Sequence, residues 1–436
     1  MQNTHSMKYK KFTKILLYPI LIYIFFELIC ITIFYLIGEN SKLDLYSKKR
    51  DGNLQYKYFK EVGLVLPNPN VKIVHYTKEY IDIFTTVDVL NKGFGLFDDG
   101  IDKDSKYFAV AIGDSFTKGV GSGDNLKNGW VELTEKNLKD IDVINLGGLG
   151  LAVDDQRYNY NRLKKFIPHD TVIYNFAGGD FFENGLDSSS SFYINYLIEN
   201  EKISFEQAQL IIHNLQSFHG YNYALEYLNQ RSFRSYSLWF FIKFAQVSKL
   251  YLVFPEAVKK KFFTKKMEKD YLNYKSTRMN MVSDEIYELS KKVQKSLKSF
   301  QFKENFFHIS QEYMNEQTVE ILIENAAKKI IDFHKDVSKD DKKFLFIVQP
   351  SKEDVYSKHI IEKLPKEYRV DYSQLREKLL KKLDDKFPIL DLTPFIEDQV
   401  FNKNKKVFWS NDTHFNPLGY ALITEEISKF LNSNIN

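Results

Sequence analysis

Two stretches near opposite ends of the chain carry side chains that together could perform nucleophilic catalysis. The first contains Ser115, which follows the apolar run 108–112 after one glycine and one aspartate. The second contains Asp412 and His414. A serine hydroxyl is a weak nucleophile until a histidine takes its proton, and a carboxylate orients that histidine. The spacing therefore predicts an acyl-transfer site with Ser115 as nucleophile, His414 as base and Asp412 as the orienting acid.

Each of these residues also has an ordinary structural interpretation. A serine at a strand-to-helix turn is most often a helix N-cap. His414 could be a surface turn residue. Gly150 ends a second glycine turn, where it could let a backbone N–H point at an oxyanion with no side chain in the way, or simply form a tight turn. These residues can form a catalytic site only if the fold brings them close together.

Alternating strand and helix signals predict how these residues are positioned. Short apolar runs that end in glycine, with helical spacing between them, are typical of a doubly wound, mostly parallel α/β sheet. Such sheets place their ligands at the carboxyl ends of the strands. The predicted strands are 80–90, 108–112, 142–146, 171–176, 343–349 and 387–392. The predicted helices of this part are 154–166, 372–383 and one that starts at Asn416-Pro417.

The pattern breaks between the two groups of strands. There the sequence has helical spacing and no strand–glycine–helix units, which predicts a large helical insertion. Its predicted helices are 204–215, 284–300 and 316–334, and the aromatic-rich segment 236–254 favours a packed helix over a second membrane span. The predicted domains are a cytoplasmic tail 1–14, a transmembrane anchor 15–37, a stalk 38–80, a first sheet part 81–187, the insertion 188–341 and a second sheet part 342–436.

The amino-terminal segment predicts the cellular location of the protein. Residues 15–37 are almost wholly apolar, and a bilayer core requires roughly 20 such residues. Lys8, Lys10, Lys11 and Lys14 precede this segment, which by the positive-inside bias keeps the short tail cytoplasmic. A cleavable signal peptide is the alternative, but it would have a shorter apolar core. The sequence thus favours a single-pass anchor with the remainder extracytoplasmic, in the periplasm or at the cell surface.

Composition narrows the class of protein. The chain is 44% apolar and 16% aromatic, so it can bury a sizeable core, and its net charge is +4. There is no basic stripe or known nucleic-acid module, which disfavours nucleic-acid binding. The single cysteine, Cys30, excludes an internal disulfide and a multi-cysteine metal site. No cofactor and no metal are expected.

Four short blocks resemble those of the SGNH (GDSL-type) hydrolase superfamily and occur in the same order. They are Gly113-Asp114-Ser115, Asn145-x-Gly-x-x-Gly150, Gly178-Gly179-Asp180 and Asp412-x-His414-x-Asn416-x-x-Gly419. The resemblance spans 108–182 and 343–431 and implies a flavodoxin-like sheet. It implies the Ser115, His414 and Asp412 roles above, an oxyanion hole at the Ser115, Gly150 and Gly179 positions, and a structural role for Asp114.

Two positions depart from the family pattern. The third block normally carries an asparagine whose side chain is an oxyanion donor, and here that position is Gly179. Asn175 or Asn184 could substitute for it. The aspartate also usually lies three residues before the histidine, where this chain has Asn411, although Asp-x-His occurs in the acetyltransferase-like branches. Both departures favour a slow, specialised or inactive enzyme.

The segments 90–94 and 350–356 resemble the membrane-anchored bacterial branch that accompanies surface-polysaccharide O-acylation. The resemblance therefore implies an esterase or O-acyl(acetyl)transferase that acts on an acylated glycan. The acceptor, water or sugar, stays open, and transfer would imply a membrane-bound acyltransferase partner. The alternatives are a non-catalytic SGNH-like protein that binds glycan or scaffolds a polysaccharide-modifying complex, and an unrelated α/β protein with chance blocks.

Overall fold

The computed structural model of the 436-residue chain describes residues 18, 21–29, 47–49, 56–77, 79–138, 140–181, 298–302, 307–311, 316–369 and 372–435. Within the apolar segment 15–37, the described residues are 18 and 21–29, all of them helical. Across the described ranges, no helix combines the length and the apolar character that crossing a membrane requires. The anchor stays a prediction. The predicted helix 204–215 and the segment 236–254 lie outside the described residues.

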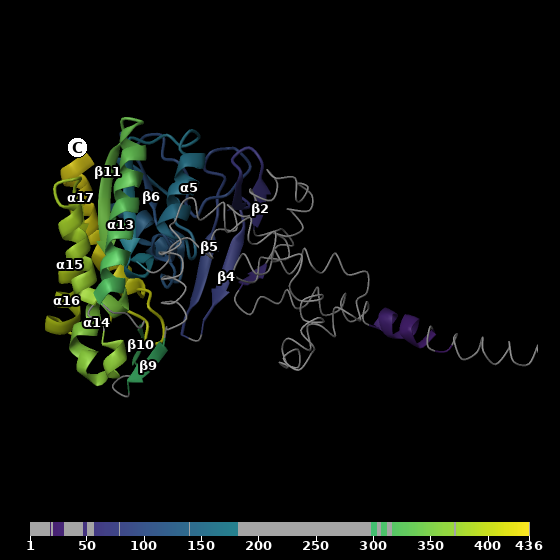
Figure 1. Ribbon diagram of the computed structural model, residues 1–436. Coiled ribbons are helices and arrows are strands. Elements are labelled where there is room, and N and C mark those ends of the chain that lie inside the picture. The colour runs from purple at the N-terminus through teal and green to yellow at the C-terminus, as the bar shows by residue number, and fades with distance from the viewer. Residues whose placement is uncertain are drawn as a thin grey trace, which may run out of the picture.

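A five-stranded parallel sheet forms the centre of the protein (Figure 1). Its strands are β6 (Tyr107–Ile112), β7 (Ile141–Asn145), β8 (Thr171–Ala177), β11 (Lys343–Gln349) and β12 (Ile389–Asp391). Their spatial order is β12-β11-β8-β6-β7. This is the flavodoxin-like 2-1-3-4-5 order, whose switch point lies between the first and third strands, here β6 and β8. The predicted α/β class and these five predicted strands are confirmed.

Helices cover both faces of this sheet. They are α2 (Ser115–Lys118), α3 (Asn125–Asn128), α4 (Trp130–Asn137), α5 (Val153–Leu163), α13 (Glu316–Ser338), α14 (Lys352–Ile360), α15 (Tyr372–Leu383), α16 (Thr393–Glu397) and α17 (Pro417–Ile435). Short turns of other helix types are η1 (Gly178–Phe181), η4 (Ile361–Lys363), η5 (Lys366–Tyr368) and η6 (Asp398–Asn402). Val110 and Ile112 face the core beneath α5, α13 and α15, while Ala109 and Ala111 face the core beneath α4, α16 and α17. Because β6 is buried on both faces, its sequence is a continuous apolar run.

Helix α13 belongs to the sheet domain. It contributes Ile330 and Phe333, both fully buried, to the same core as α5 and α15. It lies alongside β11 and α15 (Figure 1). The helix predicted at 316–334 is therefore present, but it is the crossover helix that precedes β11. The sheet domain thus resumes at 316, before the predicted boundary at 342.

A β-hairpin lies within the predicted helical insertion. Its strands β9 (Lys298–Phe302) and β10 (Phe307–Gln311) pair in antiparallel register, with Phe302 opposite Phe307. The predicted helix 284–300 is wrong at 298–300, the only part of it that the structure describes. Pairing with a strand a few residues further along the chain overrides the local helical spacing.

The segment predicted as a stalk is folded onto the sheet domain from residue 56. Its strands are β1 (Ser47–Lys49), β2 (Tyr56–Phe59), β3 (Leu64–Pro67) and β4 (Lys72–Tyr76), and the next strand along the chain is β5 (Ile81–Thr85). They form an antiparallel sheet β1-β4-β5 and a hairpin β2-β3. Phe59 and Leu64 join the main core, so this region is part of the folded body. The predicted strand 80–90 is confirmed only over 81–85 and is followed by a turn with Asn91 at φ +51°.

Candidate active site

Ser115 begins helix α2 directly after strand β6. The helix N-cap is Asp114, whose carboxylate accepts the backbone N–H of Phe116 at 2.9 Å, so the capping role considered for Ser115 belongs to its neighbour. Only glycine fits at position 113, because a Cβ there would lie 2.1 Å from Thr117 Oγ1 and 2.7 Å from the carbonyl oxygen of Asn175. The local sequence therefore leaves the Ser115 hydroxyl free to take part in chemistry.

The structure brings Ser115, His414 and Asp412 into one hydrogen-bonded chain. Ser115 Oγ lies 2.8 Å from His414 Nε2, although 299 residues separate them in sequence. His414 Nδ1 lies 2.5 Å from Asp412 Oδ1, which also accepts the backbone N–H of His414 at 2.9 Å. With Nδ1–H donated to Asp412, Nε2 is free to accept the hydroxyl proton of Ser115. This is the arrangement that acyl transfer through a serine requires.

Electrostatics favour a basic histidine at this position. Burial by itself lowers the pKa of His414, but the hydrogen bond and negative charge of Asp412 outweigh it and raise that pKa above its usual value. Burial alone would raise the pKa of Asp412, whereas its hydrogen bonds to His414 and the charge of that imidazole hold it well below the usual range. The pair thus consists of a firmly ionised carboxylate and a histidine that takes up a proton readily.

Two residues just before β5 hold the loop 409–414 that carries Asp412 and His414. The Glu79 carboxylate accepts the backbone N–H groups of Ser410 at 3.1 Å and Asn411 at 2.6 Å. The Tyr80 hydroxyl donates to Asp412 Oδ2 at 2.8 Å. Burial, followed by the nearby Asp412 charge, raises the pKa of Tyr80, so it remains a donor at physiological pH. The second oxygen of Asp412 is therefore occupied and its carboxylate plane is fixed.

A lysine at the start of α14 holds the same loop from the other side. Lys352 Nζ donates to the carbonyl oxygens of Trp409 at 2.8 Å, Ser410 at 2.7 Å and Asp412 at 3.2 Å. Lys352 is fully buried, and burial lowers its pKa to about 8. A charged ammonium has three donors, so each of these carbonyl groups receives one.

Further contacts complete this framework. Thr413 Oγ1 donates to Glu353 Oε2 at 2.6 Å, next to Lys352. Trp409 Nε1 donates to the carbonyl oxygen of Gly121 at 2.9 Å, and the Trp409 ring stacks on Tyr80 with centroids 4.7 Å apart. The base loop thus contacts the segment before β5, the loop after α2 and helix α14.

The two glycines expected to form the oxyanion hole offer backbone groups only. Gly150 adopts φ +57°, a left-handed conformation that favours glycine, and none of the described atoms lies within 4 Å of where its Cβ would be. The turn that contains it lies against α2, because a Cβ on Gly147 would be 2.3 Å from the backbone nitrogen of Lys118. Gly179 lies in η1, after β8, and is equally open within the described part of the chain.

Asn175, one of the two proposed substitutes for the missing asparagine, does not supply a donor. It is fully buried and its Nδ2 donates to Thr117 Oγ1 at 2.9 Å and Gln349 Oε1 at 2.6 Å. It therefore cannot reach toward Ser115. The other, Asn184, lies outside the described residues. Among the described residues, the backbone positions 115, 150 and 179 stay the predicted oxyanion hole.

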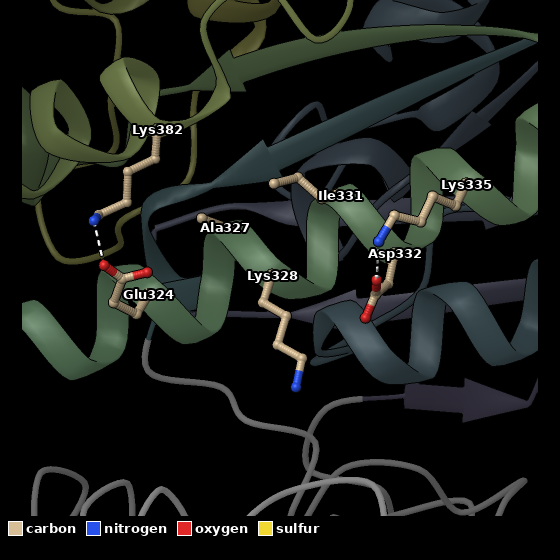
Figure 2. A pocket seen from close by; sticks show the side chains of 7 residues that line it. All are labelled: Glu324, Ala327, Lys328, Ile331, Asp332, Lys335 and Lys382. Atoms are coloured by element: carbon tan, nitrogen blue, oxygen red, sulfur yellow. Dashed lines mark hydrogen bonds and ion pairs between the residues drawn. The ribbon is translucent and has the colours of Figure 1, made fainter.

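A hollow of about 440 Å³ lies away from these residues, on α13 and α15 (Figure 2). Its lining side chains are Glu324, Ala327, Lys328, Ile331, Asp332, Lys335 and Lys382. Figure 2 shows Lys382 paired with Glu324 and Lys335 with Asp332, so much of its charge is compensated internally. This hollow contains no candidate nucleophile, and the Ser115 site remains the candidate active site.

Comparisons with known proteins identify one family and several distantly similar solved structures. The family described as "SGNH hydrolase-like domain, acetyltransferase AlgX" matches residues 303–435, which include Asp412 and His414. No curated protein matches the chain. A lipolytic G-D-S-L family protein from Veillonella parvula is 11% identical, with TM-score 0.30, over 74% of this chain and 96% of its own. The acetyl xylan esterase Est2A from Butyrivibrio proteoclasticus is 10% identical, with TM-score 0.29, over 77% and 66%.

The parallel sheet and the Ser115–His414–Asp412 chain fit an α/β protein of the acyl esterase or acyltransferase kind. With the four sequence blocks and the family match over residues 303–435, this chain resembles the SGNH hydrolase superfamily, and it resembles AlgX in its carboxyl-terminal part. The two solved structures are too distantly similar to indicate a substrate.

Proposed function

We propose that this protein is an extracytoplasmic serine enzyme that removes or transfers O-acyl groups, acetyl first among them, on a cell-surface polysaccharide. The observation that carries the proposal is the hydrogen-bonded chain from Ser115 through His414 to Asp412. The acetyltransferase family match supports the acyl group. The resemblance to the polysaccharide-modifying branch supports a glycan substrate. The lysine-flanked apolar segment 15–37 supports an extracytoplasmic location.

The first half of the reaction forms an acyl-enzyme. Ser115 Oγ attacks the ester carbonyl carbon while His414 Nε2 takes the hydroxyl proton. The carbonyl oxygen becomes an oxyanion, for which the backbone N–H groups of Ser115 and Gly150 are the candidate donors. When the ester C–O bond breaks, His414 returns the proton to the departing hydroxyl oxygen. Asp412 stabilises the imidazolium between these two steps.

The second half releases the acyl group to an acceptor. His414 takes a proton from water or from a sugar hydroxyl, whose oxygen attacks the acyl carbon on Ser115. The bond to Ser115 Oγ then breaks and the serine recovers its proton from His414. Water gives hydrolysis and a sugar gives transfer. In the transfer version, a membrane-bound acyltransferase partner delivers the acyl groups.

The test is covalent labelling of the full chain in detergent with a fluorophosphonate probe. We expect labelling of the wild type, none of Ser115→Ala, and full labelling of the control Ser433→Ala, a serine exposed on α17. Incubation with an O-acetylated oligosaccharide and an unacetylated acceptor, followed by mass analysis, separates hydrolysis from transfer. Equal labelling of wild type and Ser115→Ala would refute the assignment of the nucleophile.

Gly179 favours one second candidate, a non-catalytic protein that binds glycan or scaffolds a polysaccharide-modifying complex. No side chain supplies the third oxyanion donor at this position. On this alternative, folded wild-type protein would not react with the probe and would release no acetate, but it would retain acetylated polysaccharide in a pull-down. Ser115→Ala would bind that polysaccharide as well as the wild type does.

A further inference from the structure

A cluster of carboxylates lies beside strand β7, outside the catalytic triad. Helix α4 contributes Glu132 and Glu135, and the loop after Leu96 contributes Asp98 and Asp99. One oxygen each from Asp99, Glu132 and Glu135 lies within 4.8 Å of the others. Asp142, on β7, adds a further carboxylate whose charge reaches Glu135. Like charges at this distance destabilise the fold unless something compensates them.

Glu132 is the residue that points to a ligand. It is only 1% exposed, neither of its carboxylate oxygens accepts a hydrogen bond from a described N–H or O–H donor, and the side chain it interacts with is the carboxyl group of Glu135. The largest influences on Glu132 and Glu135 are burial and neighbouring carboxylates. A buried, unpartnered carboxylate is costly, and proteins normally pair it, protonate it or place it on a metal ion.

The repulsion between these carboxylates must be relieved in the folded protein. Two arrangements would relieve the repulsion: a proton shared between Glu132 and Glu135, or a cation held by their oxygens.

We propose that Asp99, Glu132 and Glu135 bind a hard divalent cation, which we take to be calcium. The donors are all carboxylate oxygens, a set that suits Ca²⁺, Mg²⁺ or Mn²⁺ rather than zinc or copper. Calcium–oxygen distances of about 2.4 Å allow two ligand oxygens to be up to about 4.8 Å apart, a limit that the three carboxylates satisfy. Asp99 is exposed and provides access from solvent.

The site would stabilise the oxyanion side of the candidate active site. Asp98, adjacent to the ligand Asp99, accepts the backbone N–H of Asn145 at 2.7 Å. The Asn145 side chain accepts the N–H of Gly147 at 2.9 Å and donates to the Thr117 carbonyl oxygen at 3.1 Å. A cation on Asp99 would therefore hold the turn 145–150 against α2, whatever reaction the site performs.

The experiment uses the full chain in detergent after EDTA treatment, with calorimetric titration and thermal unfolding. We expect saturable binding of one Ca²⁺ and a melting temperature several degrees higher in CaCl₂ than in EDTA at matched ionic strength. MgCl₂ and MnCl₂ are run in parallel. No heat and no change in melting temperature with any of these cations would overturn the proposal in favour of the shared proton, and binding of Mg²⁺ or Mn²⁺ alone would overturn the choice of calcium.

Substitutions test whether these residues bind the cation. Glu132→Gln removes a ligand charge and a source of repulsion, so in EDTA it should unfold at or above the wild-type temperature, while calcium should no longer stabilise it. The exposed Asp99→Asn should weaken calcium binding at least tenfold and tests the site if Glu132→Gln does not fold. Glu425→Gln, exposed on α17, should behave as wild type. Wild-type calcium affinity in Asp99→Asn or Glu132→Gln would refute the site.

Discussion

The base and the expected oxyanion hole of the Ser115 site differ in the groups that form them, which are side chains for the base and backbone for the oxyanion hole. On the base side, loop 409–414 is held by side chains from distant parts of the chain, among them Glu79, Tyr80 and Lys352. On the oxyanion side, Gly150 and Gly179 contribute backbone only, and no described atom approaches their Cβ positions. Ser115 follows β6, whereas Gly150 follows β7 and Gly179 follows β8.

This difference separates the two tasks of an acyl-transfer site. Proton transfer depends on the exact geometry of His414, which the fold secures before any substrate arrives. Oxyanion stabilisation depends on donors aimed at a charge that develops later, and here these are few. We therefore expect substitutions on the base side to cost activity, and a substitution on the oxyanion side to have room to improve it.

The largest effect is expected for Asp412→Asn. The amide can donate to Nδ1, which would place the imidazole proton on Nε2, where it cannot accept the Ser115 proton. The rate of fluorophosphonate labelling should fall by about 10⁴-fold, as expected when the tautomer is wrong. Circular dichroism should be unchanged. The control is Asp384→Asn, an exposed aspartate, which should label at the wild-type rate.

The pH profile of the same variants sharpens this prediction. His414 must be neutral to act as a base, and its pKa is raised, so the wild-type labelling rate should increase with pH through a value above that of an ordinary histidine. Loss of the Asp412 charge removes the interaction that raises the pKa of His414. The residual activity of Asp412→Asn should therefore have its acid limb at lower pH, and an unshifted limb would contradict the assignment of His414 as the titrating base.

A smaller loss is expected for Lys352→Met, which retains the length of the side chain but removes the three donors to loop 409–412. Displacing a catalytic group by about 1 Å typically reduces the rate by about 10²-fold, so labelling should slow by that order while the protein stays folded. The pKa of Lys352 is lowered to about 8, and the neutral amine has only two donors.

The wild type should consequently lose labelling rate above about pH 8. Lys352→Met, which has no ammonium to lose, should not show this alkaline limb. The exposed Lys381→Met on α15 serves as the matched control and should retain it. An alkaline limb that persists in Lys352→Met would mean that Lys352 supports the fold without positioning the loop.

A loss of about tenfold is expected for Tyr80→Phe, since a hydrogen bond to a charged group contributes roughly 1.5 kcal/mol or more. The variant leaves Asp412 Oδ2 without the donor that lies at 2.8 Å. Stacking on Trp409 is preserved by phenylalanine, so the melting temperature should change little. The control is Tyr107→Phe, because Tyr107 is a half-buried tyrosine at the start of β6. Equal labelling by Tyr80→Phe and wild type would show that Asp412 needs no third partner.

The sequence predicts the elements that carry a local signal. Apolar runs, three of them followed by glycine, predict β6, β7, β8 and β11 to within about one residue at each end. The order of the four blocks predicts that Ser115 and His414 come together. In the structure, the loop before α17 carries His414 to Ser115, where the Oγ and Nε2 atoms lie 2.8 Å apart.

The supporting contacts could not be predicted in this way. Glu79 lies 331 residues from Ser410 and Tyr80 lies 332 from Asp412, and no periodicity relates residues so far apart. Lys352 did carry a weak signal. A cation in the first turn of a helix opposes the helix dipole, so its presence there indicates a role other than stabilising the helix. The interpretation of 38–80 as a stalk failed because its short strands become stable only against the main core.

The smallest effect, and the only gain, is expected for Gly179→Asn. The position has an ordinary backbone conformation and no described atom within 4 Å of a Cβ, so the side chain can be accommodated. Removing a preorganised oxyanion donor reduces rates by about 10²–10³-fold, but an added asparagine here would have no described neighbour to fix its rotamer, so less than about tenfold should be recovered. Gly179→Ala adds the Cβ without the donor and should label at the wild-type rate. A faster asparagine variant beside an unchanged alanine variant would show that the oxyanion side limits this site. Identical rates for both would mean that position 179 does not face the oxyanion, and the contrast between the two sides of Ser115 would then rest on Gly150 alone.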